Sequence, residues 1–472
     1  MNDTIVYAIN DLEAGAKDIS FYYKELTDAE LSPFFQKLES NQTLETLDLD
    51  DNLITSCTDI TTFLKNNTTL TELTVNNNMF GESGSIEIIT AIQHHPSLKT
   101  LELDNNTWTD CTDINIESIV PALVQNTTLT RLSLSECRLF LFSNGIDSFS
   151  KVIEQNKTLV HIELNNNKIG NRGAIRLAEA LQKNTSLESL SLWHNKIGDD
   201  GVSAIAKMLF TNSTLLDLEL GANHIKRNGC KALAHALRDV NDKGSQNPLS
   251  FTYESDRRSL RDKSDNVPLS DLYESDTLCV SLRYNSSLTR LGLDQNKISC
   301  EGAIELANML QKNTTLLTLD IGDNDIKTKG IQALAHALCI NTTLTDMDMN
   351  SCESENQGIQ SIIQVMRQNQ TLKSLDIWGI HMDSKEIEML TDALSTNYSM
   401  TCIGKVLPIP YLERNQRLFN MTMGWKTKMN CIWASVIKTD VTCCLGIFSE
   451  YLQIKNLFLR IKKQKEINKN EK

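Results

Sequence analysis

One short motif recurs along this chain in a constant phase, and this repeat constrains the fold more than any other feature. In eleven copies, Asn-x-Thr/Ser leads into Leu-x-x-Leu-x-Leu-x-x-Asn or a close variant, with Leu or Met in the first apolar place. A fixed period of this length predicts a solenoid, in which each repeat contacts only its neighbours. The first apolar residues of the repeats, most of them 28 positions apart, are Leu44, Leu70, Leu98, Leu129, Leu159, Leu187, Leu215, Leu288, Leu316, Leu344, Leu372 and Met400.

Residues 187–212 show how one repeat should fold. Leu190 and Leu192 alternate with polar residues, which predicts a short strand whose leucines face inward. Val202 and Ile205 follow at helical spacing, so the return limb should be an amphipathic helix. Strands and helices then alternate, and all strands run parallel. Because strands lie about 4.8 Å apart and packed helices about 8–10 Å apart, the stack should bend with its strands on the inner arc.

An asparagine closes each predicted strand. Its amide both donates and accepts hydrogen bonds, so the side chains should bond the backbone of neighbouring coils in a ladder. Cys137 and Cys352 take the same place in two repeats, which predicts a structural role for both. The ladder comprises Asn52, Asn78, Asn106, Asn167, Asn195, Asn223, Asn296 and Asn324.

A second asparagine opens each motif and matches the glycosylation acceptor pattern. We interpret these asparagines as structural, because each lies where a helix ends and a strand begins. Asparagine tolerates the left-handed backbone that is common at helix ends, and the following Thr or Ser can bond the turn. They are Asn41, Asn67, Asn126, Asn156, Asn184, Asn212, Asn285, Asn313, Asn341, Asn369 and Asn397.

The repeat unit resembles the ribonuclease-inhibitor type of leucine-rich repeat. The best copies are residues 159–184 and 288–313, and the resemblance covers residues 16–418. It implies an α/β fold, a curved right-handed horseshoe with parallel strands on the concave face and helices on the convex face. The unit also resembles the repeat region of NACHT leucine-rich-repeat receptors. No Gly-x-x-x-x-Gly-Lys-Ser/Thr loop is present in the sequence, so we do not expect a NACHT domain.

The phase of the repeat predicts the domain boundaries. The gap between Leu215 and Leu288 exceeds one period by 45 residues, and this extra segment holds the near-duplicates NPLSFTYESD and VPLSDLYESD, so we expect a flexible insertion. The expected segments are an N-terminal extension (1–15), a degenerate capping repeat (16–40), repeats (41–238), the insertion (239–283), repeats (284–403), a C-terminal cap (404–418) and a basic amphipathic tail (419–472).

Composition predicts a cytoplasmic protein without catalytic activity. The first residues have neither a basic nor an apolar signal region, and the twelve cysteines are scattered without a Cys-x-x-Cys pair. No metal-ligand spacing and no pairing of a nucleophile with a base is evident. We therefore expect no enzyme, no cofactor and no metal. The sequence leaves the oligomeric state open.

The residues between the leucines indicate where a partner would bind. In the middle exposed column of the predicted strands, seven of eleven residues are acidic, against one in eight in the whole chain. Tryptophans in the next column and nearby histidines would anchor a partner, since exposed aromatic residues are typical of interfaces. The predicted partner-binding residues are Trp193, Trp378, His161, His194, Glu102, Glu163, Glu219, Asp320, Asp348 and Asp376. Such a column could equally be an ordinary solvated face.

The net charge of the repeat region indicates which class of partner it would bind. Residues 1–402 carry 33 Lys and Arg against 55 Asp and Glu, so we expect a protein with a basic surface and not a nucleic acid. The predicted function is therefore a scaffold for protein–protein interaction. The alternative is a regulator of a small GTPase, because the repeat type is shared with Ran GTPase-activating proteins. The basic tail could lie on an acidic membrane, though an appended helix or a disordered end explains it more simply.

Overall fold

The computed structural model describes residues 2–106, 116–137, 145–238, 284–380, 382–397, 399–400 and 402–403. The chain divides into two compact units, residues 1–405 and 406–472, and the described residues all belong to the first. The predicted insertion, C-terminal cap and basic tail lie outside the described residues.

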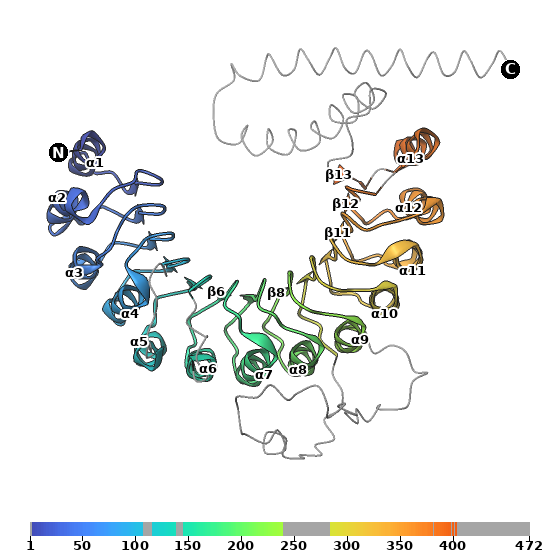
Figure 1. Cartoon of the computed structure of the whole chain (residues 1–472), viewed down its shortest axis with the longest axis horizontal. Coiled ribbons are helices and arrows are strands. Elements are labelled where there is room, and N and C mark those ends of the chain that lie inside the picture. Colours follow the sequence, from blue (N-terminus) through green and yellow to red (C-terminus); the bar gives the residue numbers. More distant parts are fainter. Residues whose placement is uncertain are drawn as a thin grey trace, which may run out of the picture. The chain divides into compact units, whose positions relative to one another are not determined.

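Short parallel strands in sequence order form one open sheet, which confirms the predicted fold class. Figure 1 shows the strands along the inner edge of the repeat unit and the helices along its outer edge. The thirteen strands are β1 (Asp18–Ser20), β2 (Thr46–Asp48), β3 (Glu72–Thr74), β4 (Thr100–Glu102), β5 (Arg131–Ser133), β6 (His161–Glu163), β7 (Ser189–Ser191), β8 (Asp217–Glu219), β9 (Arg290–Gly292), β10 (Thr318–Asp320), β11 (Asp346–Asp348), β12 (Ser374–Asp376) and β13 (Cys402–Ile403).

Within the described residues, a helix follows each of the strands β1 to β12, and one helix precedes β1. The helices are α1 (Asp3–Glu13), α2 (Asp28–Leu38), α3 (Thr58–Asn66), α4 (Gly81–Ala91), the 3-10 turn η1 (Ile116–Ser118), α5 (Ile119–Gln125), α6 (Gly145–Gln155), α7 (Gly170–Leu181), α8 (Asp199–Leu209), α9 (Arg227–Ala236), α10 (Cys300–Leu310), α11 (Lys327–Ile340), α12 (Asn356–Gln368) and α13 (Ser384–Thr396). Neighbouring helices pack side by side along the row.

The register repeats the sequence period. Leu47, Leu73 and Leu101 pair across β2, β3 and β4, and all three are fully buried. Since successive side chains of a strand point to opposite faces, the residues on either side of each leucine point out of the core. The repeat therefore sets both the core and the exposed columns.

The first coil begins earlier than the motif. Ile19 in β1 pairs with Leu47, so residues before the first clear repeat already belong to the sheet. Before β1 lies helix α1, where the sequence analysis expected only an extension. The Asn2 side chain caps this helix, accepting from the Thr4 amide at 3.0 Å, and Ile5, Ala8 and Leu12 are buried. The period could not indicate α1, because this helix lies outside the repeat.

The asparagine ladder forms as predicted. The side-chain nitrogen of Asn195 donates to the Leu164 carbonyl at 2.8 Å, and its side-chain oxygen accepts from the backbone amide of Asn167 at 2.9 Å. The Asn195 backbone amide in turn donates to the Asn223 side chain at 2.9 Å. Cys137 fits the same ladder, because its thiol donates to the Leu103 carbonyl at 3.3 Å. Each ladder side chain thus joins adjacent coils through buried bonds.

The asparagines that open each motif are also structural, but the reason we expected was wrong. Asn67, Asn126 and Asn369 end helices in extended backbone, with φ of −85°, −70° and −78°, and not in the left-handed region. What keeps asparagine here is its side chain. The Asn369 oxygen accepts from the Thr371 and Leu372 amides, and its nitrogen donates to the Leu338 carbonyl at 2.7 Å.

His95 replaces asparagine in this second column. Its Nδ1 accepts from the Leu98 amide at 3.1 Å, as the asparagine oxygen does elsewhere. Its Nε2 is buried and has no hydrogen-bond partner among the described residues. Burial also lowers the pKa of the His95 imidazole below its usual value. A buried donor without an acceptor is costly, so this coil is less well joined than its neighbours.

We therefore expect His95→Asn to stabilise the protein by about 1 kcal/mol at pH 7.5, since the amide can make both bonds of the column. Because the folded pKa of His95 is lowered, wild type loses stability as pH falls through the unfolded value near 6.5. The gap between variant and wild type should widen at pH 5.5. Chemical denaturation at both pH values measures it, and a variant less stable than wild type at pH 7.5 would contradict the assignment.

Candidate functional site

The exposed side of the sheet carries three columns of side chains, one from each outward position. The register places Ser191 beside Glu219, Glu219 beside Gly292, and Gly292 beside Asp320. Asp348 and Asp376 continue this middle column on β11 and β12. The consecutive strands β10, β11 and β12 therefore each place a carboxylate in this column, and neighbouring strands lie about 4.8 Å apart.

In the N-terminal part of the middle column, one cation partly offsets the acidic charge. Arg131 lies between two predicted binding residues and pairs with Glu102 at 3.5 Å and with Glu163 at 2.5 Å. His161 is half-buried and pairs with Arg131 in the register of β5 and β6. Glu102, Arg131 and Glu163 form a local ion-pair group whose net charge is reduced to −1.

The C-terminal part lacks a paired cation within the described residues. Glu219, Asp294, Asp320, Asp348 and Asp376, here called the acidic strip, are half-buried and have no ion pair recorded among the described residues. The nearest cation on these strands is Arg290, whose recorded pair is with Asp217 at 3.9 Å. The strip therefore concentrates negative charge over β8 to β12.

Four carboxylates of the strip also hold the backbone. Each accepts a hydrogen bond from the amide two residues later, where the strand ends. The bonds join Glu219 to Gly221 at 2.7 Å, Asp320 to Gly322 at 3.0 Å, Asp348 to Asn350 at 2.8 Å and Asp376 to Trp378 at 2.8 Å. The column of like charges therefore also has a structural role, because each of these acids satisfies an amide that the sheet leaves open.

Asp48 caps the Asp50 amide in the same way at 3.0 Å. The coils from β3 to β7 satisfy the equivalent amides differently. There the side chain of one coil accepts from the backbone of the next. The Asn76 oxygen accepts from the Asp104 amide at 2.7 Å, and the Asp104 carboxylate accepts from the Ser135 amide at 2.7 Å. The series ends at Trp193, whose amide is bonded at 3.0 Å to Asn165 but whose indole offers no acceptor. From the next coil onward, the strand acids take over this role.

Partial burial raises the pKa of four carboxyls of the strip, those of Glu219, Asp294, Asp320 and Asp348. The pKa of Glu219 and that of Asp320 are each raised to about 7, mainly because burial disfavours the charged form. Neighbouring carboxylates raise both values further, and the same causes raise the pKa of Asp294 and Asp348. The Glu219 carboxylate lies directly over Gly292, where a Cβ would come within 2.3 Å of it. Glycine at 292 thus makes room for the buried carboxylate.

The two predicted tryptophan anchors differ in exposure. Trp193 is half-buried over Gly221 and donates a hydrogen bond to Asp294. Trp378 is 54% exposed at the far end of the strip. His194 lies on the turn after β7 with φ of +55°, exposed, with its ring 5.2 Å from that of Trp193. Trp193 is thus largely part of the sheet surface, whereas Trp378 is free to contact a partner.

The sequence analysis missed two residues that shape this surface. Asp294 lies in the same column as Trp193 and Trp378, where only aromatic residues had been noted. Arg131 lies in the third column, which was not considered. Writing out all three columns would have found both, because the register follows directly from the period.

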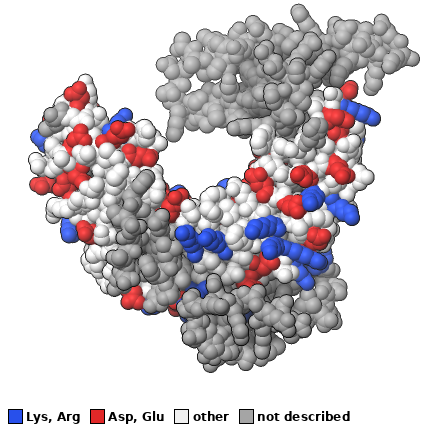
Figure 2. Space-filling model, viewed as in Figure 1, with Lys and Arg blue, Asp and Glu red and all other residues white. Residues whose placement is uncertain are grey.

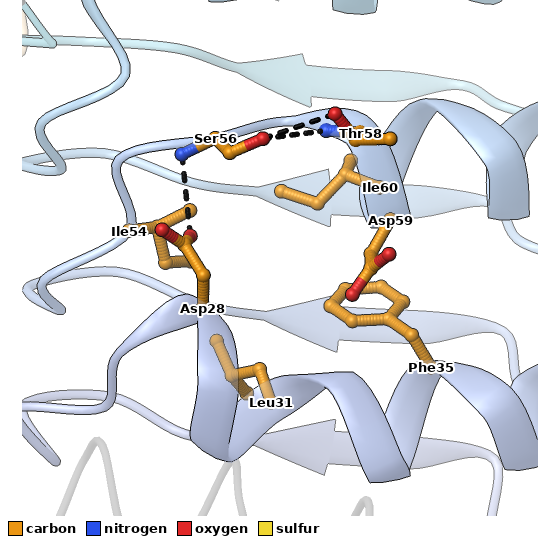
Figure 3. Close-up of a pocket in the computed structure, with 8 residues that line it drawn as sticks. All are labelled: Asp28, Leu31, Phe35, Ile54, Ser56, Thr58, Asp59 and Ile60. Carbon is orange, nitrogen blue, oxygen red and sulfur yellow. Dashed lines mark hydrogen bonds between the residues drawn. The ribbon is translucent and has the colours of Figure 1, made fainter.

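Cavities and metal sites offer no alternative centre in the described part of the chain. A cavity of about 70 Å³ lies between α2 and the segment before α3, as Figure 3 shows, whereas ligand pockets usually span about 300–1,000 Å³. Its Asp28 carboxylate already accepts from the Thr55 and Ser56 amides. No group of three His, Cys, Asp or Glu within the described ranges is placed to hold a metal ion. None of the helices described is both long and apolar enough to cross a membrane.

Comparison with known proteins gives the family of the repeat. Residues 155–178, 183–206, 211–234, 284–307 and 312–335 match the family described as "Leucine Rich repeat". No curated protein matches the chain. Among solved structures, an internalin from Listeria monocytogenes is similar, with 16% identity and a TM-score of 0.43 over 84% of this chain and 88% of that one. The described part of the chain is therefore a solenoid of leucine-rich repeats.

Proposed function

We propose that this protein is a non-enzymatic scaffold that binds a basic surface of a partner protein on its acidic strip. Stacked repeats of this kind present long concave surfaces that suit protein partners. The observation that carries the proposal is the contrast within one column. Arg131 pairs with both Glu102 and Glu163 and offsets one of their two charges, whereas five carboxylates between Trp193 and Trp378 have no ion pair recorded in the described residues.

The strip has the dimensions of a short extended segment. Trp193 and Trp378 lie two residues after β7 and β12, five strand spacings apart, which corresponds to about 24 Å. An extended chain covers this distance in about seven residues. Each capping carboxylate uses one oxygen for the backbone amide, so its second oxygen can accept from Lys or Arg. The indole of Trp378 would pack on the aliphatic part of such a side chain or stack with a guanidinium.

The alternative raised from the sequence, regulation of a small GTPase, has no observation of its own in its favour among the described residues. We therefore do not develop it.

Replacing Trp378 should separate binding from folding. We expect Trp378→Ala to weaken the partner about 30-fold, as loss of an exposed aromatic anchor does, with little change in stability. Partners would be captured from native extract on the immobilised full chain and identified by mass spectrometry. Affinities of each captured partner would then be measured for wild type and variant at low and high salt.

Tyr22→Ala is the matched control, because Tyr22 is also an exposed aromatic residue, 56% accessible, but lies beside β1 at the other end of the sheet. The proposal requires a partner whose affinity falls with salt, falls with Trp378→Ala and is unchanged by Tyr22→Ala. If every captured partner binds Trp378→Ala and Asp348→Asn as tightly as wild type, the strip is not the binding surface.

A further inference from the structure

The segments that lead from strand to helix form a second charged surface on the central coils. Because the coils stack in parallel, these segments follow one another along one side of the solenoid. Five of them, 168–173, 196–201, 224–229, 297–302 and 325–330, together carry eight Lys or Arg and four Asp or Glu, in a chain with a net charge of −14. We call them the basic rim. Figure 2 shows Lys and Arg gathered over the central coils of the face in view.

Three lysines of the rim occupy backbone that does not favour them. Lys168, Lys196 and Lys327 have φ of +57°, +60° and +57°, in the left-handed region where Asn and Gly are the usual residues. All three side chains are exposed. The fold would therefore be served at least as well by asparagine at 168 and 196, where the positive charge has no local structural cause, whereas Lys327 pairs with Asp325 at 3.3 Å.

The starts of the helices show the same conflict. The first turns of α7, α9 and α11 contain no acidic residue. They hold instead Arg172, Arg227 and Lys329, although the positive end of the helix dipole disfavours cations there. The dipoles and the basic side chains thus reinforce one another along the rim. Arg172 pairs with Asp147 at 3.4 Å and Arg227 with Glu305 at 3.7 Å, while α8 and α10 keep acidic residues in their first turns. A local rule broken on three of the five helices of the rim favours a functional constraint.

Most of the acids in the rim are already engaged. Asp199 accepts from the Lys226 and Gly229 amides at 2.7 and 3.0 Å, which joins two coils. Asp325 pairs with Lys327 at 3.3 Å, and Glu301 accepts from Ser299. By contrast, Lys168, Lys196 and Lys297 are exposed and have no ion pair recorded within the described residues.

The rim spreads in two dimensions. Adjacent strand ends lie about 4.8 Å apart and adjacent helix starts about 8–10 Å apart, so five segments span about 20 Å on the inner side and about 40 Å on the outer. They contain no Phe, Tyr or Trp on which the bases of a single-stranded nucleic acid could stack. Cations spread over two dimensions, without aromatic residues among them, suit a broad anionic surface better than a linear nucleic acid.

We propose that the basic rim docks the protein on the phosphate-bearing surface of an anionic phospholipid bilayer. This surface is separate from the acidic strip, and the inference does not rest on the proposed function. The strip faces the inner arc, and ions screen its repulsion beyond about 8 Å at physiological salt. Each Lys or Arg of the rim that approaches the headgroups adds to the attraction.

The test compares the full chain with a triple variant, Lys168→Asn, Lys196→Asn and Lys327→Asn, in co-sedimentation with vesicles. One set of vesicles contains phosphatidylserine and phosphatidylcholine, and the other contains phosphatidylcholine alone. We expect wild type to bind only the anionic vesicles, with an affinity that falls as salt is raised. The triple variant should bind at least about tenfold more weakly. Its thermal stability should equal or exceed that of wild type, because asparagine suits the left-handed backbone.

The matched control removes three lysines from the helix-to-strand side of the coils, Lys99→Asn, Lys157→Asn and Lys183→Asn, and should bind like wild type. If both triple variants bind anionic vesicles equally, the rim is not the docking surface and another part of the chain is responsible. If the rim variant loses affinity for duplex DNA or RNA but keeps that for vesicles, the rim binds nucleic acid and the membrane proposal fails. Wild type that ignores anionic vesicles would overturn it directly.

Discussion

Asn195→Ala should destabilise the solenoid by about 3 kcal/mol. The substitution leaves the Leu164 carbonyl and the Asn167 and Ile169 amides without their partner, all of them in the buried ladder. Alanine offers no replacement, and a buried polar group without a bond costs about 1–3 kcal/mol. Because each repeat contacts only its neighbours, the loss should weaken one junction and make unfolding less cooperative.

Two further variants make this test specific. Asn66→Ala removes an asparagine on the exposed surface of α3 and should change stability by less than about 0.5 kcal/mol. Asn195→Cys should cost less than Asn195→Ala, since Cys137 makes one ladder bond with its thiol. Denaturant midpoints and slopes for the three variants give the comparison. Equal midpoints for Asn195→Ala and Asn66→Ala would mean that the ladder adds no net stability.

The ladder also shows what the sequence could predict. A period states which residues are equivalent, so the parallel register, the inward leucines and the structural role of Cys137 all followed from counting. It says nothing about segments outside it, which is why α1 was missed although Ile5, Ala8 and Leu12 have helical spacing. The period did not give the physical reason why a particular residue type occupies each position of the repeat. The opening asparagines are kept by their side-chain bonds and not by a left-handed backbone.

The candidate site was only partly accessible from the sequence. The acidic column could be located, but not the difference between its two parts. That difference depends on the Arg131 side chain, which reaches from β5 to Glu102 on β4 and to Glu163 on β6. It also depends on the carboxylates that accept from the backbone amides of residues 221 and 322. Side-chain rotamers and hydrogen bonds of this kind depend on the residues of the neighbouring coils. Knowing which residues are equivalent between repeats does not specify them.

The acids of the strip should make the protein less stable as pH rises. The pKa of Glu219 and Asp320 is about 7 in the folded chain, above the usual value near 4 for an unfolded carboxyl. Between these values the folded state holds more protons, so the free energy of unfolding falls as pH rises through this window. For two half-exposed groups we expect a loss of about 2 kcal/mol between pH 5.5 and 8.

Glu219→Gln with Asp320→Asn isolates this effect. Both amides can still accept from the backbone at 221 and 322, but neither can ionise. The stability gap between the double variant and wild type should widen by about 2 kcal/mol between pH 5.5 and pH 8, in favour of the variant. Titration of His95, Asp50 and Asp104 affects both proteins equally and cancels in the difference. Denaturation curves at several pH values test it, and a gap that stays constant with pH would show that these carboxyls ionise normally.

The same two carboxyls predict the opposite pH dependence for partner binding. A basic partner favours the charged form, so its affinity for wild type should increase as pH rises from 5.5 to 8 while the free chain becomes less stable. The negative charges of Asp217, Asp294 and Asp348 oppose ionisation of the two carboxyls. The positive charge of Arg290 favours ionisation of Asp320. Binding at pH 6.5 should therefore release protons, which calorimetry in buffers of different ionisation enthalpy detects. A captured partner that releases as many protons on binding the double variant must bind elsewhere. Loss of that release in the variant would locate the partner's cations on the strip.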